Sequence, residues 1–296
     1  MRAVVLHENG GPEVLRLEQA PDPKPAEGEL LVHVEAAGVN HFDLNQRAGG
    51  ATPPAILGVD AGGWVEEDES RRRVLVTSAR GAYAELTVAA ADNVFEIPDA
   101  VSASVAAAIG VPYRTAWWSI VDLGGLEEGS RLLVQAGSSA TGQACVDIGR
   151  ALGAEVFATA SAGKLDRLRE LGAEPLAYDD PRLESLGADV VFDPVGRETF
   201  DRSIAALGHE GRLVTPGAVG DPQVTFNLWT LMAKRGSVIG IGSAPVVRET
   251  IEKLIELAAR GELAPAIDRE LPLEQAAEAH RAIEARETFG KVILRP

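Results

Sequence analysis

Short β-branched segments, separated by glycine, proline and charged turns, dominate the first hundred residues. They predict strands at residues 2–6, 30–36, 63–66, 74–77 and 83–88, with no helical pattern between them. Three prolines, at positions 21, 23 and 25, interrupt the chain between the first two strands. This pattern favours a small barrel-like β domain over a sheet with helical crossovers.

From about residue 103, apolar strands alternate with helical patterns. Helices are predicted at residues 105–109, 116–123, 164–171 and 199–207, and strands at 132–135, 156–159, 189–192, 212–215 and 238–241. This alternation predicts an α/β domain whose parallel sheet is covered on both faces. Two helices (247–260 and 274–286) and a closing strand (291–294) follow. The closing strand resembles the N-terminal part, so we expect a discontinuous first domain, residues 1–107 with 245–296, and a second domain, 108–244.

A loop of small residues, 136–142, connects the strand at 132–135 to a helix. Gly137 and Gly142 are its only glycines, because Ala136, Ser138, Ser139 and Ala140 fill the other positions of the usual G-x-G-x-x-G pattern. Bare backbone N–H groups at the start of a helix can bind a pyrophosphate. We therefore predict a nucleotide site at Ser138, Ser139, Ala140 and Thr141; an α/β turn without a ligand is the alternative.

Composition narrows the function classes. The chain has 296 residues, 46% of them hydrophobic, a formal net charge of −16 and one cysteine. It carries neither an apolar run of bilayer length nor a signal peptide, so we expect a cytoplasmic protein. The acidic balance argues against nucleic-acid or anionic-membrane partners, even though Arg71–Arg73 follow acidic residues 66–69 across a predicted solvated turn. Cys145 lies on an apolar helix face and is predicted to be a core residue.

Seven motifs in one order carry a resemblance to a known family. They are AAGVNHFD (36–43), ILGVDAGG (56–63), GAYAE (81–85), the loop segment, DVVFDPVG (189–196), GRLVTPG (211–217) and FGKVIL (289–294). With them the chain resembles the zinc-independent quinone oxidoreductases of the medium-chain dehydrogenase/reductase superfamily, the group that includes zeta-crystallin. The resemblance implies a GroES-like catalytic domain and a doubly wound Rossmann domain with the cofactor in the cleft. It also implies a homodimer, for which residues 238–241 are a candidate edge strand.

The positions of zinc ligands in related alcohol dehydrogenases hold unsuitable residues here. The resemblance places Asn40 where those enzymes have Cys and Val59 where they have His, and neither side chain suits catalytic zinc. His41 and Asp60 lie nearby but fall short of three ligands. We therefore expect no metal, and acceptors that are already electrophilic, such as quinones and α,β-unsaturated carbonyls.

The resemblance also suggests residue roles. Asn40 lies near the nicotinamide and would hydrogen-bond the acceptor oxygen or the cofactor, unless it only caps its loop. Asp43 would fix that loop or take part in a proton relay, and His41 would deliver the proton that follows the hydride, unless it is a bystander. Tyr113 and Thr115 fall where the family contacts the nicotinamide, although Tyr113 alternatively serves packing. His7, His33, His209 and His280 lack a partner at a suggestive spacing and are predicted to be ordinary surface or core residues.

Cofactor choice follows from the end of the strand at 156–159. NAD-specific folds place an acidic residue there, whereas this chain has Ala160 and Ser161, followed by Lys164 and Arg167. A 2′-phosphate would meet a hydroxyl and cations, so we predict NADPH; a solvated Lys164 at a helix start is the alternative. Tyr178 matches a family position that flanks the same phosphate. The remaining predicted cofactor contacts follow later strands: Val195, Gly196, Gly217, Ala218 and Val219.

Two other functions stay open. One is an aldehyde or alcohol dehydrogenase of the same fold. The other is a low-turnover NADPH-binding protein with a structural or sensing role, which the glycine-poor loop keeps possible.

Overall fold

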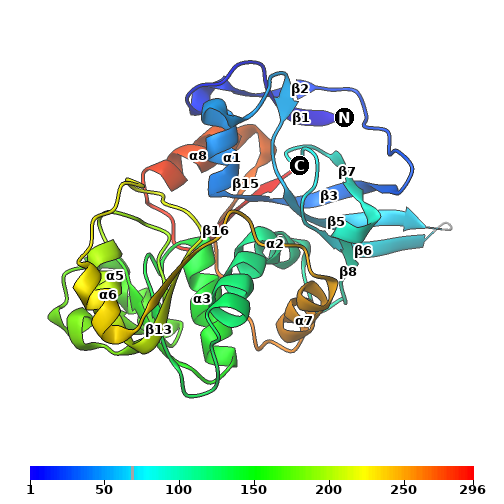
Figure 1. The fold of residues 1–296 in the computed structure, drawn as a ribbon. Helices are drawn as coiled ribbons and strands as arrows, with labels where there is room; N and C mark the ends of the chain where they lie inside the picture. The colour runs from blue at the N-terminus through cyan, green and yellow to red at the C-terminus, as the bar shows by residue number, and fades with distance from the viewer. Residues whose placement is uncertain (68–69) are drawn as a thin grey trace. The chain divides into compact units, whose positions relative to one another are not determined.

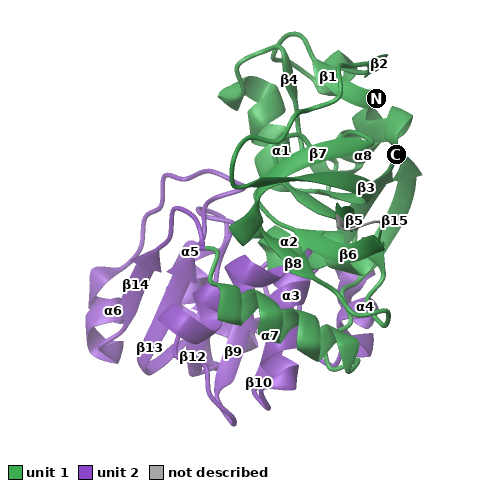
Figure 2. Cartoon of the chain, turned by 90° about the vertical axis from the view of Figure 1, so that its right-hand side faces the viewer, with its two compact units in different colours: residues 1–112, 246–296 green, residues 113–245 purple. Residues whose placement is uncertain are grey.

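The computed structural model describes residues 1–67 and 70–296. The chain divides into two compact units, residues 1–112 with 246–296 and residues 113–245, which Figure 2 shows in different colours. We call them the first and the second unit. The sequence-based seams at 107/108 and 244/245 stay predictions of where the domains divide.

The second unit is built on a six-stranded parallel sheet (Figure 1). The strand order β11-β10-β9-β12-β13-β14 is that of a doubly wound sheet: successive strands are added on one side of β9 as far as β11 and then on its other side from β12 onward. This confirms the predicted α/β fold class. The strands are β9 (Arg131–Val134), β10 (Glu155–Thr159), β11 (Glu174–Leu176), β12 (Ala188–Phe192), β13 (Leu207–Thr215) and β14 (Ser237–Gly240). The helices are α3 (Ala140–Ala151), α4 (Leu165–Glu170), α5 (Phe200–Ala206) and α6 (Leu228–Lys234).

The first unit is mainly antiparallel. Its larger sheet has the order β15-β16-β3-β5-β6-β8 with β7 also paired to β3, and its smaller sheet has the order β2-β1-β4. The strands are β1 (Arg2–Leu6), β2 (Leu15–Gln19), β3 (Glu29–Val39), β4 (Ala55–Ile56), β5 (Asp60–Glu67), β6 (Ser70–Val76), β7 (Leu86–Ala90), β8 (Val94–Glu96), β15 (Ile267–Pro272) and β16 (Lys291–Arg295). The helices are α1 (His41–Asn45), α2 (Ala103–Trp117), which runs past the seam, α7 (Arg248–Ala259) and α8 (Ala276–Glu284).

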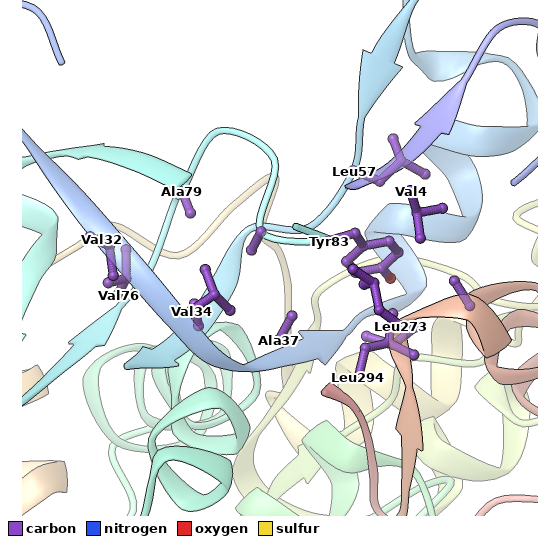
Figure 3. Close-up of a cluster of buried hydrophobic side chains, with 14 of the residues drawn as sticks. Val4, Val32, Val34, Ala37, Leu57, Val76, Ala79, Tyr83, Leu273 and Leu294 are labelled. Atoms are coloured by element: carbon purple, nitrogen blue, oxygen red, sulfur yellow. The ribbon is translucent and has the colours of Figure 1, made fainter. Parts of the chain in front are cut away.

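The core of the first unit gathers side chains from both ends of the chain. Val4, Val34, Leu57, Tyr83 and Leu294 belong to one buried hydrophobic cluster, part of which Figure 3 shows. Strand β16 pairs antiparallel with β3, so Leu294 and its neighbours lie in the sheet that the N-terminal segment forms. Burial of this apolar area is the main stabilising contribution to such a unit.

The structure corrects two details of the predicted helices and strands. Residues 105–123 lie in α2 and a π-type turn in direct succession, although two separate helices were predicted at 105–109 and 116–123. The helix kinks at Gly110, which places Pro112 in the first turn after the kink, where its missing N–H is tolerated. The strand predicted at 83–88 begins only at Leu86, because Tyr83 lies in an irregular segment bonded to Leu57.

Two composition-based predictions can be placed in the structure. Cys145 is fully buried in α3, as predicted, and burial raises the pKa of its thiol. Pairing of β5 with β6 places Glu66 opposite Arg71, while residues 68 and 69 of the predicted charged turn lie outside the described residues. No helix in the described part of the chain is long and apolar enough to cross a bilayer.

Candidate functional site

The predicted cofactor residues of the second unit lie along one edge of its sheet. Because β9 to β14 are parallel, the segments that follow them emerge at the same, carboxyl edge. The structure places there Ser138 to Thr141 after β9, Ser161 and Lys164 after β10, Tyr178 after β11, Val195 and Gly196 after β12, and Gly217, Ala218 and Val219 after β13. The topology thus brings these predicted residues to one edge, and their contacts with a cofactor stay predictions.

The loop between β9 and α3 is tightly folded. Ala136 adopts φ = +53°, a left-handed conformation that glycine adopts with less strain. Gly142 packs directly against this residue, since a Cβ at position 142 would overlap the Ala136 carbonyl oxygen. Position 142 therefore carries the glycine that its close packing requires, whereas position 136 carries alanine in a conformation that favours glycine.

Ser139 is the N-cap of α3. Its hydroxyl accepts the Gly142 N–H at 3.0 Å and donates to the Ala136 carbonyl at 2.9 Å. The cap uses the Gly142 N–H, so the N–H groups of Ala140 and Thr141 would be the donors of this turn for an anion. The 12-residue helix adds the positive end of its dipole at the same place.

A buried polar ladder supports this loop from below. Asp193, which follows β12, accepts hydrogen bonds from the hydroxyls of Thr199 and Ser203. Gln135 then donates to the Ser203 hydroxyl at 3.1 Å and accepts from the Thr159 hydroxyl at 2.6 Å. Burial raises the pKa of Asp193, and the hydrogen bonds from Ser203, Val195 and Thr199 oppose that shift. The ladder links the ends of β12, β9 and β10, so the predicted cofactor edge is held by side-chain bonds as well as by the sheet.

The residues predicted to contact a 2′-phosphate lie after β10 and after the neighbouring strand β11. Ser161 and Lys164 belong to one tight turn, in which the Lys164 N–H donates to the Ser161 carbonyl at 2.8 Å. Ser161 is exposed and Lys164 half-buried, and Tyr178 is exposed after the neighbouring strand β11. Ser161 and Lys164 thus follow the strand at whose end an NAD-specific fold has a carboxylate, and their contact with a 2′-phosphate stays a prediction.

Tyr113 is buried against α3. Its hydroxyl donates to Asp147 at 2.7 Å, which is the packing role left open for this residue. Thr115, two residues further along α2, is half-buried, and its carbonyl accepts the Ser119 hydroxyl at 2.7 Å. The nicotinamide contacts expected of Tyr113 and Thr115 stay predictions.

In the first unit, Asn40 and Asp43 form a capping box at the start of α1. The Asp43 carboxylate accepts the Asn40 N–H at 2.8 Å. Asp43 is 1% exposed and Asn40 is 7% exposed. This is the geometry expected of a carboxylate that fixes the loop. His41 is exposed at the first position of the helix; desolvation by neighbouring protein lowers its pKa, Glu284 opposes that shift and Arg286 adds to it.

The side chain of Asn40 joins a buried ion pair. Its amide nitrogen donates to Asp60 at 2.9 Å, and its amide oxygen accepts from the Lys291 ammonium at 2.5 Å. Lys291 and Asp60, 3.4 Å apart, are 2% and 0% exposed. Burial lowers the pKa of Lys291, and Asp60 and Asp43 oppose that shift.

Asp60 also stabilises the kink of α2 by accepting a backbone hydrogen bond just after Gly110. Both of its carboxylate oxygens accept the Val111 N–H at 3.0 Å, and one accepts the Thr77 hydroxyl at 3.3 Å. Gly110 makes this approach possible, because a Cβ there would overlap the Asp60 carboxylate. One carboxylate thus joins α2, β5 and the loops that carry Asn40 and Thr77.

A second buried chain of hydrogen bonds reaches Asp43 from α8 and corrects the prediction that His280 is an ordinary residue. The Tyr83 hydroxyl lies 3.1 Å from His280 Nε2 and 3.3 Å from Asp43, and Arg47 lies 3.3 Å from His280 Nδ1. Because Arg47 can only donate, Nδ1 accepts, Nε2–H donates to Tyr83, and Tyr83 donates to Asp43. Arg47 also pairs with Glu284. His280 is fully buried, with its pKa lowered to about 3 by burial and by Arg47.

We expect the stability of the protein to carry a pH signature of Asp43. Burial, with a further contribution from Asp60, raises its pKa to about 7, although the Asn40 N–H, Lys291 and Tyr83 oppose the shift. The folded state therefore binds a proton that the unfolded state releases near pH 4. Between about pH 4 and 7 the contribution of Asp43 to the free energy of unfolding therefore falls as the pH rises, by at most about 1.4 kcal/mol per pH unit.

Denaturant titrations of the wild type and Asp43→Asn, at half-unit steps from pH 5 to pH 8, measure this contribution. The amide oxygen that the variant carries at position 43 can accept the same two hydrogen bonds, from the Asn40 N–H and the Tyr83 hydroxyl, without ionising. His280 contributes an opposite pH dependence to both proteins, so it cancels when their free energies of unfolding are subtracted. As the pH rises to about 7, the free energy of unfolding of the variant should increase relative to that of the wild type. A difference that stays constant across this range would contradict the assignment.

A cavity of about 660 Å³ lies beside α1. Phe42 and Gln46 line it from the helix side, and residues 54–59 line it from the strand side. Most of its lining is apolar, with Gln46, Thr52 and Arg80 as polar side chains. These properties suit a small apolar molecule with a few polar atoms.

Sequence reasoning missed the part that Lys291, Tyr83, His280 and Arg47 play in this site. One signal was available for Lys291, which starts the apolar segment KVIL: a charged residue in a buried strand needs a partner. The His280 partners are 233 and 197 residues away in sequence, so no local spacing reveals them.

Comparisons with known proteins agree with this architecture. Residues 26–99 match the model of the alcohol dehydrogenase GroES-like domain, and residues 171–294 match that of the zinc-binding dehydrogenase domain. A quinone oxidoreductase of Mus musculus is 30% identical over 99% of this chain and 97% of its own. The solved structure of an NAD-dependent alcohol dehydrogenase aligns over the whole of both chains with a TM-score of 0.92 and 32% identity. A mycobacterial protein solved in complex with NADPH aligns equally completely, with a TM-score of 0.89 and 30% identity.

Proposed function

Because this chain belongs to the quinone oxidoreductase branch of the medium-chain dehydrogenase/reductase superfamily, and is thereby an NAD(P)-dependent oxidoreductase, we propose that it reduces quinones or α,β-unsaturated carbonyls with NADPH and without a metal. The observation that carries the metal-free proposal is the Lys291 ammonium, 2.5 Å from the amide oxygen of Asn40. A divalent cation bound at Asn40 would lie beside this positive charge. The isopropyl group of Val59 also offers no ligand atom.

The overall reaction is balanced as NADPH, acceptor and one proton giving NADP⁺ and the reduced acceptor. Bound NADPH supplies the hydride, and conjugation in the acceptor spreads the developing negative charge to its oxygen. The exposed His41 is our candidate for the proton, since its lowered pKa makes the protonated ring a stronger acid. The apolar cavity beside α1 is our candidate acceptor pocket, because it would exclude water from one face of a flat, conjugated ring.

We expect Lys164→Glu to weaken the binding of NADPH and to leave the binding of NADH unchanged. A carboxylate next to Ser161 would repel the 2′-phosphate, so the KM for NADPH should rise at least about tenfold while kcat and the KM for NADH stay nearly unchanged. The measurement follows NADPH and NADH absorbance with benzoquinone, naphthoquinone and an enone as acceptors. Lys24→Glu, an exposed charge reversal in the first unit, is the matched control. A wild type that prefers NADH, with the preference unchanged in the variant, would overturn the phosphate proposal.

One comparison favours a second candidate function. The solved relative with a TM-score of 0.92 is described as an NAD-dependent alcohol dehydrogenase, so an alcohol or aldehyde substrate is the main competing proposal. Stimulation by added zinc together with strong inhibition by EDTA would support it. A low-turnover NADPH-binding role would instead appear as tight NADPH binding without oxidation across a broad acceptor panel.

We also propose that the protein forms a homodimer through the edge strand β14. Val238 on this strand is 39% exposed, and α6 just before it exposes Leu228, Trp229 and Met232 by 59%, 75% and 55%. An unpaired edge with apolar side chains nearby suits pairing with a second copy. Light scattering in solution measures the oligomeric state directly.

A further inference from the structure

The buried hydrogen bonds of the second unit run in one direction, from a carboxylate to the nucleotide loop. The Asp193 carboxylate can only accept, so the Ser203 hydroxyl donates to it at 2.7 Å. This hydroxyl has a single hydrogen, so it accepts from the amide nitrogen of Gln135 at 3.1 Å. The amide oxygen of Gln135 in turn accepts the Thr159 hydroxyl at 2.6 Å. All four side chains are at most 1% exposed, so each bond is oriented by its neighbour rather than by solvent.

This chain of bonds ends on the backbone of the nucleotide loop. Because the Thr159 hydroxyl gives its hydrogen to Gln135, its oxygen accepts the Ala136 N–H, at 3.3 Å. The Thr159 carbonyl accepts the next N–H of the loop, that of Gly137, at 2.8 Å. One residue at the end of β10 therefore anchors two successive peptide groups of the loop that follows β9.

Ala136 is the residue of this loop whose conformation needs an anchor. Its φ of +53° is left-handed, which is strained for alanine and readily adopted by glycine. Such strain persists only where the surrounding structure holds the residue in place. Thr159 holds the N–H of Ala136, while Ser139 holds its carbonyl through the hydroxyl at 2.9 Å and the N–H at 3.0 Å. Side-chain bonds thus give the loop a shape that glycine would give it through its conformational freedom.

We propose that Thr159 and Gln135 are positioning residues for the dinucleotide, which act through Ala136 by holding the nucleotide loop in the shape that binds a pyrophosphate. Asp193 and Ser203 orient the Gln135 amide from the other end of the chain. The inference rests on the proposed function for the identity of the ligand. It goes beyond that function because it explains how a loop poor in glycine serves as the site.

Removal of the Thr159 hydroxyl in two backgrounds tests the proposal. Thr159→Val takes the acceptor away from the Ala136 N–H, so we expect the Kd for NADPH, measured by calorimetry, to rise about tenfold. Ala136→Gly removes the strain, so in that background Thr159→Val should raise the Kd by less than about threefold. The kcat at saturating NADPH should stay within about twofold of the wild type in both backgrounds, because the proposed role is confined to binding.

Two variants serve as controls. Thr159→Ser keeps the hydroxyl and should bind NADPH within about threefold of the wild type. Thr225→Val is the same exchange at an exposed position of the second unit and should match the wild type. A folded Thr159→Val variant that binds NADPH as tightly as the wild type would overturn the proposal. An equal rise in Kd in both backgrounds would also overturn it, because the hydroxyl would then act by a route other than Ala136.

Thermal unfolding without NADPH separates this inference from the proposed function. Thr159→Val should lower the midpoint less in the Ala136→Gly background than in the wild type, whatever the ligand of the loop. A wild type that binds no dinucleotide would overturn the proposed function, whereas a wild type that binds NADPH, with equal losses in both backgrounds, would overturn only the inference.

Hydrogen exchange of the wild type decides the question if Thr159→Val does not fold. The amide hydrogens of Ala136 and Gly137 should exchange slowly in the absence of NADPH, because Thr159 accepts both of them. Rapid exchange at Ala136 would overturn the proposal.

Discussion

Replacing Lys291 with methionine should lower the free energy of unfolding by about 3–5 kcal/mol, because it leaves the carboxylate of Asp60 buried without its cation. Methionine has a similar volume to the aliphatic part of lysine, so the packing against Gly38 changes little. Denaturant unfolding at pH 7 measures the loss. Lys24→Met, at an exposed position, should stay within about 0.5 kcal/mol of the wild type.

A double-mutant cycle shows whether the ion pair is the cause. In Lys291→Met with Asp60→Asn, position 60 no longer carries an unpaired charge, so the double variant should be more stable than Lys291→Met alone. Equal stabilities of these two variants would mean that the loss comes from packing around Lys291 rather than from the stranded carboxylate.

Replacing Gly142 with alanine should damage the nucleotide loop. The new Cβ would overlap the Ala136 carbonyl oxygen, so either the loop or the first turn of α3 must move. Such overpacking destabilises a protein by about 1–3 kcal/mol. Because the N–H groups of the same turn would bind the pyrophosphate, we also expect NADPH affinity, measured by calorimetry, to fall about 10- to 100-fold.

Gly163 supplies the control for this experiment. A Cβ at position 163 meets no atom within 4 Å, and the residue lies in the turn between Ser161 and Lys164. Gly163→Ala should leave stability and NADPH affinity nearly unchanged. If Gly142→Ala bound NADPH as tightly as this control, the loop would not be the pyrophosphate site.

The sequence was most informative where the signal is periodic or local. The alternation of apolar strands and helices after residue 103 predicted the parallel sheet, because a strand buried on both faces must be almost entirely apolar. The same topology then brought Ser138, Ser161 and Val195 to one edge without any information about their side chains. Short strands such as β4 and β8 escaped prediction, because two or three residues carry no detectable period.

The network around Asn40 was only partly predictable. Asp43 is three residues from Asn40, and a capping box has that spacing, so a local signal for its link to the loop is present in the sequence. Lys291 and His280 reach the same place through tertiary packing of β16 and α8, and no spacing in the sequence relates them to Asn40. The need for glycine at positions 38 and 110 was equally unpredictable from local sequence. It arises because the side chains of Lys291 and Asp60 pack against these two positions in the folded protein.

The position of Lys291 on β16 also has a consequence for biosynthesis. The ribosome adds this residue 231 positions after Asp60, which at about 5–20 residues per second is a delay of roughly 10 to 50 s. Throughout that interval a nascent chain holds Asn40 and Asp60 without the ammonium that orients them. The hydrogen bonds that join Asn40, Asp60 and Lys291 therefore form only after β16 has been translated, even if the strands translated earlier have already collapsed.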